Sequence, residues 1–181
     1  MADNDAGNNP AVTLLRRLFG TAHNMWFLGT LNDLEMAEAH WQPPGKAMPA
    51  AAHAAHVVLA EDFLLSNGLF KTKPLGLTRF AGKQGVSAPP PTGGAWDKWA
   101  RSVHVDLPIL TKYAQAVFAN TDEQLAKMSD ADLDTTQDFS SVGFGIMPTA
   151  DFLAILLSHV GVHSGEISAM KGLQGHKGYP I

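Results

Sequence analysis

Apolar side chains recur at three- and four-residue steps along four segments of the chain, a spacing typical of helices with one buried face. We predict helices over residues 10–39, 48–67, 95–118 and 148–172. The first begins at Pro10, a residue suited to a first helical turn, and ends before the breaker Pro43-Pro44-Gly45. No stretch alternates apolar and polar residues over a useful length, so we expect no β-strand.

Local signals indicate how three of these helices end, bend or begin. Gly68 is expected to end the second helix, because a left-handed cap suits glycine. Pro108 is expected to kink the third helix, since proline lacks an N–H group and clashes with the preceding turn. Thr149 is placed to cap the start of the fourth helix.

Two long connections separate the helices. Residues 70–94 contain Pro89-Pro90-Pro91, and a loop of this length inside a compact domain is often functional. The alternatives to a functional loop are a lid without chemistry or simply a mobile excursion. Residues 125–145 form a second irregular connection with one short helical turn near Asp130, and the tail from residue 173 is not helical.

Four amphipathic helices of similar length predict an all-α fold, a four-helix bundle. The chain has 181 residues, of which 45% are hydrophobic, and this size and composition suit one domain over residues 1–181.

Charge and composition exclude several classes of protein. The net charge is −4 with charged residues at 17% and no run of Lys or Arg, so nucleic acid and membrane surfaces are not expected partners. The start of the chain is polar and acidic, unlike a secretory signal, and the run Phe152–Leu157 is far shorter than the roughly 20 residues of a membrane span. We therefore expect a soluble, cytoplasmic protein. Cysteine is absent, so a bound metal would have nitrogen and oxygen ligands.

Three histidines form the strongest chemical pattern. His159 and His163 are four residues apart on the fourth predicted helix, about 40° apart around its axis, on its apolar face. Both imidazoles can therefore meet one ion, and His56 on the second helix is the best third ligand. His53 could replace His56, but it lies off the line of Ala52, Leu59 and Phe63, which we expect to face inward. The alternative is that the histidines satisfy one another by hydrogen bonds without metal.

Glu166 follows the histidine pair on the same helix face. It could orient a histidine, bind the water of a metal ion or act as a general base, or it could be a polar residue at the mouth of the bundle. Glu61 and Asp62 fall on other sides of the second helix, where we expect them to be solvated or bonded to a neighbouring helix. His23 is expected to have a structural role.

Two stretches together form a recognisable motif. They are His53-Ala54-Ala55-His56 through Phe63, and His159-Val160-Gly161-Val162-His163-Ser164-Gly165-Glu166. They resemble the DinB-like (YfiT-like) metalloenzyme superfamily over nearly the whole chain. The resemblance implies an antiparallel four-helix bundle with a long crossover loop, a site of His56, His159 and His163 that often holds zinc or nickel, and a homodimer. It also implies either thiol-dependent transfer or isomerisation, or metal-dependent hydrolysis.

Three functional hypotheses follow. The first is a metal-dependent transferase or hydrolase acting on a small molecule, with Glu166 as proton acceptor. A thiol reaction would need an external low-molecular-weight thiol, since the chain has no cysteine. The second is a non-catalytic metal-binding or stress-related bundle in which the ion is structural. The third is a metal-free interaction module.

Overall fold

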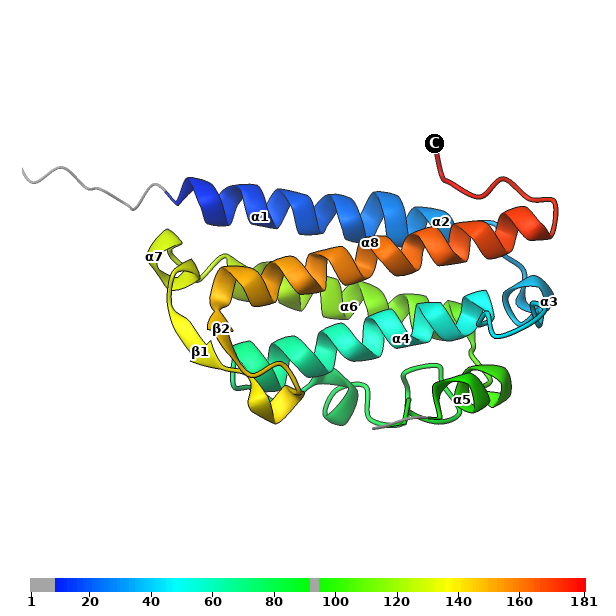
Figure 1. The fold of residues 1–181 in the computed structure, drawn as a ribbon, viewed down its shortest axis with the longest axis horizontal. Coiled ribbons are helices and arrows are strands. Elements are labelled where there is room, and N and C mark those ends of the chain that lie inside the picture. Colours follow the sequence, from blue (N-terminus) through cyan, green and yellow to red (C-terminus); the bar gives the residue numbers. More distant parts are fainter. Residues whose placement is uncertain (1–8, 92–94) are drawn as a thin grey trace, which may run out of the picture.

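Four long helical segments lie side by side along the molecule (Figure 1). The computed structural model describes residues 9–91 and 95–181. The first of the four segments is α1 (Pro10–Thr21), continued by the π-helical η1 (Ala22–Leu28) and by α2 (Gly29–Leu31). The second is α4 (Ala50–Phe63), continued by the π-helical η2 (Leu64–Leu69). The third and fourth are α6 (Leu107–Leu125) and α8 (Thr149–Leu173). The all-α prediction is confirmed.

The order of the helices in space requires a long crossover. In Figure 1, α1 and α8 run in one direction, and α4 and α6 run in the other. Around the bundle, α4 packs against α6 and α8, and the first segment packs against the same two helices. Because α4 and α6 are parallel, the chain between them must return along the whole bundle, and it does so along one face.

Small side chains let α4 approach α8 closely. Five alanines in its first half are at most 1% exposed: Ala50, Ala51, Ala52, Ala54 and Ala55. The core forms two clusters of buried apolar residues, one around α4 with Tyr113 and Leu110 of α6. The other lies at the far end of the bundle, where Phe139 and Phe152 stack with ring centroids 4.0 Å apart. One position on α4 differs from expectation: Phe63, predicted to face inward, is 46% exposed.

The crossover carries short elements of its own. They are the 3-10 turn η3 (Leu75–Leu77), helix α5 (Trp96–Ser102) and an isolated bridge between Val86 and Val105. Asp62 of α4 anchors the start of the crossover, because its carboxylate accepts hydrogen bonds from the backbone N–H groups of Leu75 and Gly76 at 2.9 and 2.7 Å. Part of the predicted loop, residues 92–94, lies outside the described residues, and its action as a lid stays a prediction.

Two predicted helices are divided. The first ends at Leu31 rather than at residue 39, and a separate α3 (Met36–Ala39) follows a break in which Asp33 has a φ of 60°. The third is divided into α5 and α6. Pro108 lies in the first turn of α6 and does not kink it, because Asp106 caps this helix by accepting from the N–H of Ile109.

Three further expectations about local structure are wrong. Gly68 lies inside η2, and the left-handed conformation occurs at Lys71, with a φ of 53°. Thr149 is the first residue of α8 and makes no cap; its hydroxyl instead donates to the carbonyl of Thr135 at 3.0 Å. That bond lies beside an unexpected hairpin of β1 (Thr136–Asp138) and β2 (Ile146–Pro148), whose strands are too short to show alternation. The connection also contains α7 (Asp130–Leu133), as predicted, and the 3-10 turn η4 (Ser140–Val142).

Helix α8 is more apolar than the short run Phe152–Leu157 indicated. It has 25 residues and a mean hydropathy of 1.2 over its most apolar window, enough for a membrane span by length and composition alone. The core helix of a soluble protein passes the same test. Helix α8 packs along α4 and presents buried residues such as Phe152, Val160 and Ile167 to the bundle, and 39% of that window is buried. One such helix is weak evidence for a membrane span. The cytoplasmic compartment of the protein stays a prediction.

Candidate metal centre

Helices α4 and α8 face each other and bring three predicted histidines together. His56 lies on α4, and His159 and His163 lie one turn apart on α8. One ring nitrogen from each lies within 4.8 Å of those of the other two, so the group could hold a metal ion. The two Nε2 atoms of His56 and His159 are 2.9 Å apart. The convergence that the sequence predicted is therefore present, and both α4 and α8 contribute to it.

His53 also reaches this region, although it lies off the line of apolar residues on α4. It is 4% exposed, and its Nδ1 atom lies 3.1 Å from Nδ1 of His163. Both histidines of α4 therefore face α8, at two different levels along the helix axis. His56 meets His159, while His53, one turn earlier, meets His163.

Glu166 lies between His53 and His163. Its Oε2 accepts a hydrogen bond from Nδ1 of His163 at 2.5 Å and lies 3.0 Å from Nδ1 of His53. A carboxylate bonded to one ring nitrogen fixes the tautomer and orientation of an imidazole and leaves the other nitrogen for a metal. Of the roles proposed from the sequence, orienting a histidine is thus the one for which the structure shows a contact. The side chain is 45% exposed.

Burial favours the uncharged form of three imidazoles in this region, those of His56, His159 and His53. It lowers the pKa of His56 to about 3, helped by the neighbouring His159, His163 and His53. Burial likewise lowers the pKa of His159 to about 4, with a smaller contribution from His163. The pKa of His53 is also lowered by burial, although Glu166 opposes this. Neutral imidazoles keep the lone pairs that bind metal ions.

One buried atom of the group has no polar partner. Nδ1 of His56 makes no hydrogen bond among the residues that the structure describes. The ring of Trp96 packs against this imidazole edge-on, with centroids 4.6 Å apart, and holds its orientation by contact instead. An ion on Nε2 would leave Nδ1 unpaired, so this atom does not itself point to a metal. What fits an ion is the donor set, because uncharged imidazole nitrogens converge within 4.8 Å.

Comparison with known proteins agrees with the fold. The family model described as DinB superfamily matches residues 21–167. This chain belongs to the DinB superfamily. A solved structure described as a conserved protein from Enterococcus faecalis has a TM-score of 0.75 and 22% identity, covering 89% of this chain and 95% of that one. At that identity the likeness shows the fold alone. No curated protein matches the chain.

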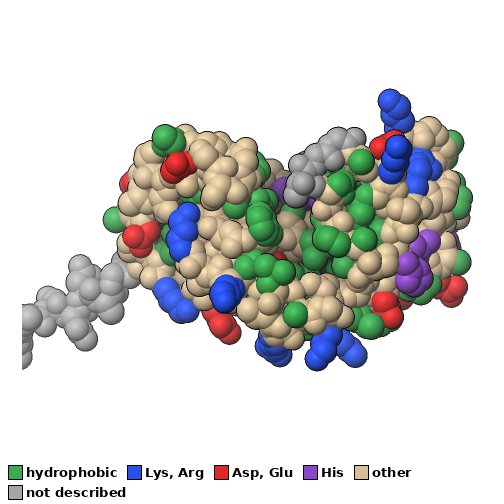
Figure 2. Space-filling model, turned by 90° about the horizontal axis from the view of Figure 1, so that it is seen from below, with side chains coloured by type: hydrophobic (Ala, Val, Ile, Leu, Met, Phe, Trp, Pro, Cys, Tyr) green, Lys and Arg blue, Asp and Glu red, His purple; other side chains and the backbone are tan. Residues whose placement is uncertain are grey.

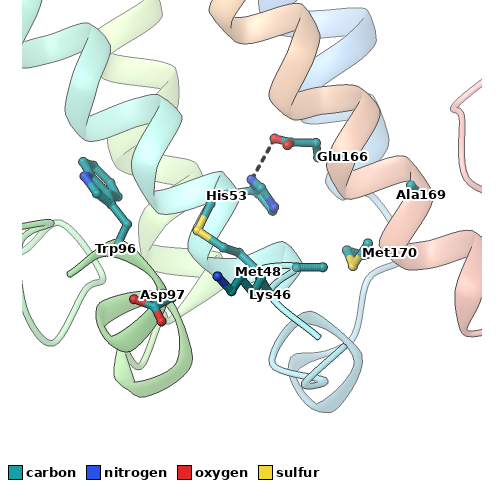
Figure 3. Close-up of a pocket in the computed structure, with 9 residues that line it drawn as sticks. Lys46, Met48, His53, Trp96, Asp97, Glu166, Ala169 and Met170 are labelled. Carbon is teal, nitrogen blue, oxygen red and sulfur yellow. Dashed lines mark ion pairs between the residues drawn. The ribbon is translucent and has the colours of Figure 1, made fainter. Parts of the chain in front are cut away.

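A cavity of about 490 Å³ opens beside the histidines of this DinB-superfamily bundle. It is lined by Lys46, Ala47, Met48, His53, Trp96, Asp97, Glu166, Ala169 and Met170. Figure 3 shows His53 and Glu166 pointing toward each other across it, with Trp96 and Met48 on its walls. The face that carries the crossover is hollowed, and a histidine is visible in the hollow among hydrophobic side chains (Figure 2). A small molecule in this cavity would lie beside Glu166 and His53, which both line it.

Two carboxylates of α4 are buried in a way that sequence periodicity could not locate. Glu61 accepts from the hydroxyl of Thr121 at 2.7 Å and lies 2.9 Å from Nε2 of His23. Asp62 accepts from the hydroxyl of Tyr113 at 2.6 Å as well as from the crossover backbone. Of the two expectations for this pair, bonding to neighbouring elements is therefore confirmed, and both side chains help to hold α4 in place.

Proposed function

We propose that the chain binds one divalent transition metal, zinc or nickel, through His56, His159 and His163. The observation that carries this proposal is the convergence of three ring nitrogens from two facing helices within 4.8 Å. Three imidazole ligands with open positions are typical of catalytic rather than structural zinc sites. We infer a metal-dependent enzyme of the thiol-dependent S-transferase or hydrolase type.

The protein's own side chains have distinct tasks in this proposal. His56 and His159 stay neutral and hold the ion, and Glu166 fixes His163 through Nδ1 and accepts a proton from the reacting group. When bound, the ion supplies Lewis acidity and lowers the pKa of a water or thiol ligand. The cavity beside Glu166 accepts the small substrate, and any thiol must come from a second small molecule, since the chain has no cysteine.

The first test is metal content. We expect at least about one equivalent of metal per chain in untagged protein purified without a nickel column. The affinity for metal should fall at least tenfold in His159→Ala and in His163→Ala. His104→Ala, an exposed histidine outside the group, is the matched control. Protein that carries no metal and refuses zinc and nickel on titration would contradict the proposal.

A non-catalytic role for the ion is the second candidate. The observation that favours it is that the ligands come from both α4 and α8, so an ion would also hold these helices together. Turnover of thiol-plus-electrophile or ester substrates that disappears in Glu166→Gln, with metal content measured alongside, separates the two. Metal without turnover in any such screen leaves the structural role.

The homodimer stays a prediction. Leu14, Leu18 and Met25 of the first helical segment are 58%, 45% and 46% exposed, an apolar stripe that supports association of two copies. Sedimentation velocity measures the state directly, and a monomer at micromolar concentration would contradict it.

A further inference from the structure

A second set of metal-ligating side chains lies directly beside the three-histidine group. His53, His163 and Glu166 each offer one ligand atom, and these atoms also lie within 4.8 Å of one another. The hydrogen-bond geometry narrows this to a small triangle. Its sides are 2.5 Å from His163 Nδ1 to Glu166 Oε2, 3.0 Å from His53 Nδ1 to the same oxygen, and 3.1 Å between the two nitrogens.

Hydrogen bonds alone satisfy this triangle poorly. If both nitrogens carry a proton, two N–H groups crowd onto one carboxylate oxygen. If only His163 does, the lone pair of His53 Nδ1 faces a carboxylate oxygen 3.0 Å away. A cation above the face of the triangle attracts all three atoms. Neighbouring ligands of an octahedral ion with bonds of about 2.1 Å lie about 3.0 Å apart, which matches the sides of 3.0 and 3.1 Å. The side of 2.5 Å, from His163 Nδ1 to Glu166 Oε2, would lengthen when an ion binds.

We propose that the chain holds a second divalent ion through His53 Nδ1, Glu166 Oε2 and His163 Nδ1, with His163 shared between the two ions through its two ring nitrogens. This rests on the proposed function only through His163, which also belongs to the first group. The second ion displaces the proton that His163 Nδ1 otherwise donates to Glu166, and that proton leaves to the solvent. Glu166 then acts as a ligand, and its negative charge offsets part of the repulsion between the two cations.

The ligands give the second ion a different character from the first. The first group is three neutral imidazoles, whereas the second is two imidazoles and one carboxylate on one side of the ion. Such a set leaves open positions and suits ferrous iron, and the carboxylate favours manganese more than an all-histidine site does.

The cavity lies on the side of the second ligand set. Of the histidines that the structure describes, His53 alone lines it, together with Glu166, and Figure 3 shows a dashed line joining the two across it. His53 is 4% exposed and therefore held in place, while Glu166 is 45% exposed and offers a route of entry for the ion. The open positions of the second ion thus face the space where a substrate fits, whereas His56 and His159 of the first group do not line this cavity.

Zinc stoichiometry at equilibrium tests this proposal. Metal-free protein dialysed against micromolar zinc should hold two ions per chain, as should the control His104→Ala. His53→Ala and Glu166→Gln should each hold one, His159→Ala should also hold one, and His163→Ala should hold neither tightly. The second equivalent should release more protons than the first, measured from the buffer dependence of the binding heat. Far-UV circular dichroism checks folding first. Because Glu166 is half exposed, Glu166→Gln remains informative if His53→Ala fails to fold.

The outcomes separate this inference from the proposed function. One ion in the parent protein and one in both His53→Ala and Glu166→Gln would overturn the second ion and leave the three-histidine site standing. Two ions retained in His53→Ala and Glu166→Gln would place the second ion elsewhere and also overturn it. One ion retained by His163→Ala would overturn the proposal that His163 is a ligand of both ions. No zinc in any protein would refute the proposed function itself.

Discussion

At the scale of the residue, the site depends on imidazoles that the protein keeps neutral. His56 and His159 are held among other histidines and apolar groups, so burial opposes their protonation. The same burial has a cost below neutral pH, because the unfolded chain can protonate these side chains freely. Metal binding and stability against acid are therefore linked through the same two residues.

The metal-free protein should lose stability as pH falls from 6.5 toward 4. In the unfolded chain each histidine binds a proton with a pKa near 6.5, but in the folded chain His159 does so only at about 4 and His56 at about 3. The unfolded state thus gains protons first, and each pH unit in this window costs about 1.4 kcal/mol per histidine. Urea unfolding at pH 7.5, 6 and 5 measures this. The variant His56→Gln/His159→Gln should show a flatter profile, and equal slopes in both proteins would argue against the lowered pKa values.

At the scale of the element, sequence periodicity predicts what lies along one helix. The helix predicted over residues 148–172 agrees with α8, which spans Thr149–Leu173. The agreement is close because the apolar positions of this segment run without interruption. The breaks after Leu31 and Ser102 were missed, since apolar positions continue across them. The convergence of His56 with the α8 pair was predictable from face and spacing. The contact of His53 with Glu166 was not, because it depends on how closely the alanine-rich start of α4 approaches α8, and a single helix pattern contains no such distance.

Two glycines of the crossover allow a matched test of how it is held against α6. Both require a left-handed backbone, with φ of +78° at Gly85 and +67° at Gly82. A Cβ at Gly85 would lie 2.6 Å from the backbone N of Leu110 and 2.8 Å from the carbonyl of Asp106, whereas at Gly82 it would meet nothing within 4 Å.

Gly82→Ala should therefore lower the free energy of unfolding by about 1 kcal/mol, the cost of placing a residue with a Cβ in the left-handed conformation. Gly85→Ala should lower it by about 1–3 kcal/mol more through overpacking. The free energy of unfolding in urea measures both. Losses of equal size would show that the crossover moves freely away from the start of α6.

At the scale of the whole molecule, the topology explains why the site joins α4 and α8. Parallel α4 and α6 force the long crossover, and they leave α8 antiparallel to α4 along its length. Residues about 100 positions apart in sequence, such as His56 and His159, are thereby brought within 2.9 Å. An ion bound here must exist in the folded state and has no equivalent site in the unfolded chain, so its binding free energy adds to the stability of the bundle.

This coupling predicts a melting temperature that depends on metal. Zinc free at 100 times its dissociation constant should stabilise the fold by about 2.7 kcal/mol, which for a domain of this size raises the melting temperature by about 5–10 °C. Thermal melts followed by circular dichroism, with zinc and with excess EDTA, measure the difference. His163→Ala, which removes the residue common to both ligand sets, should melt at the same temperature in both conditions, whereas His104→Ala should keep the full shift. A shift that survives in His163→Ala would mean that zinc stabilises the protein from somewhere other than the interface of α4 and α8.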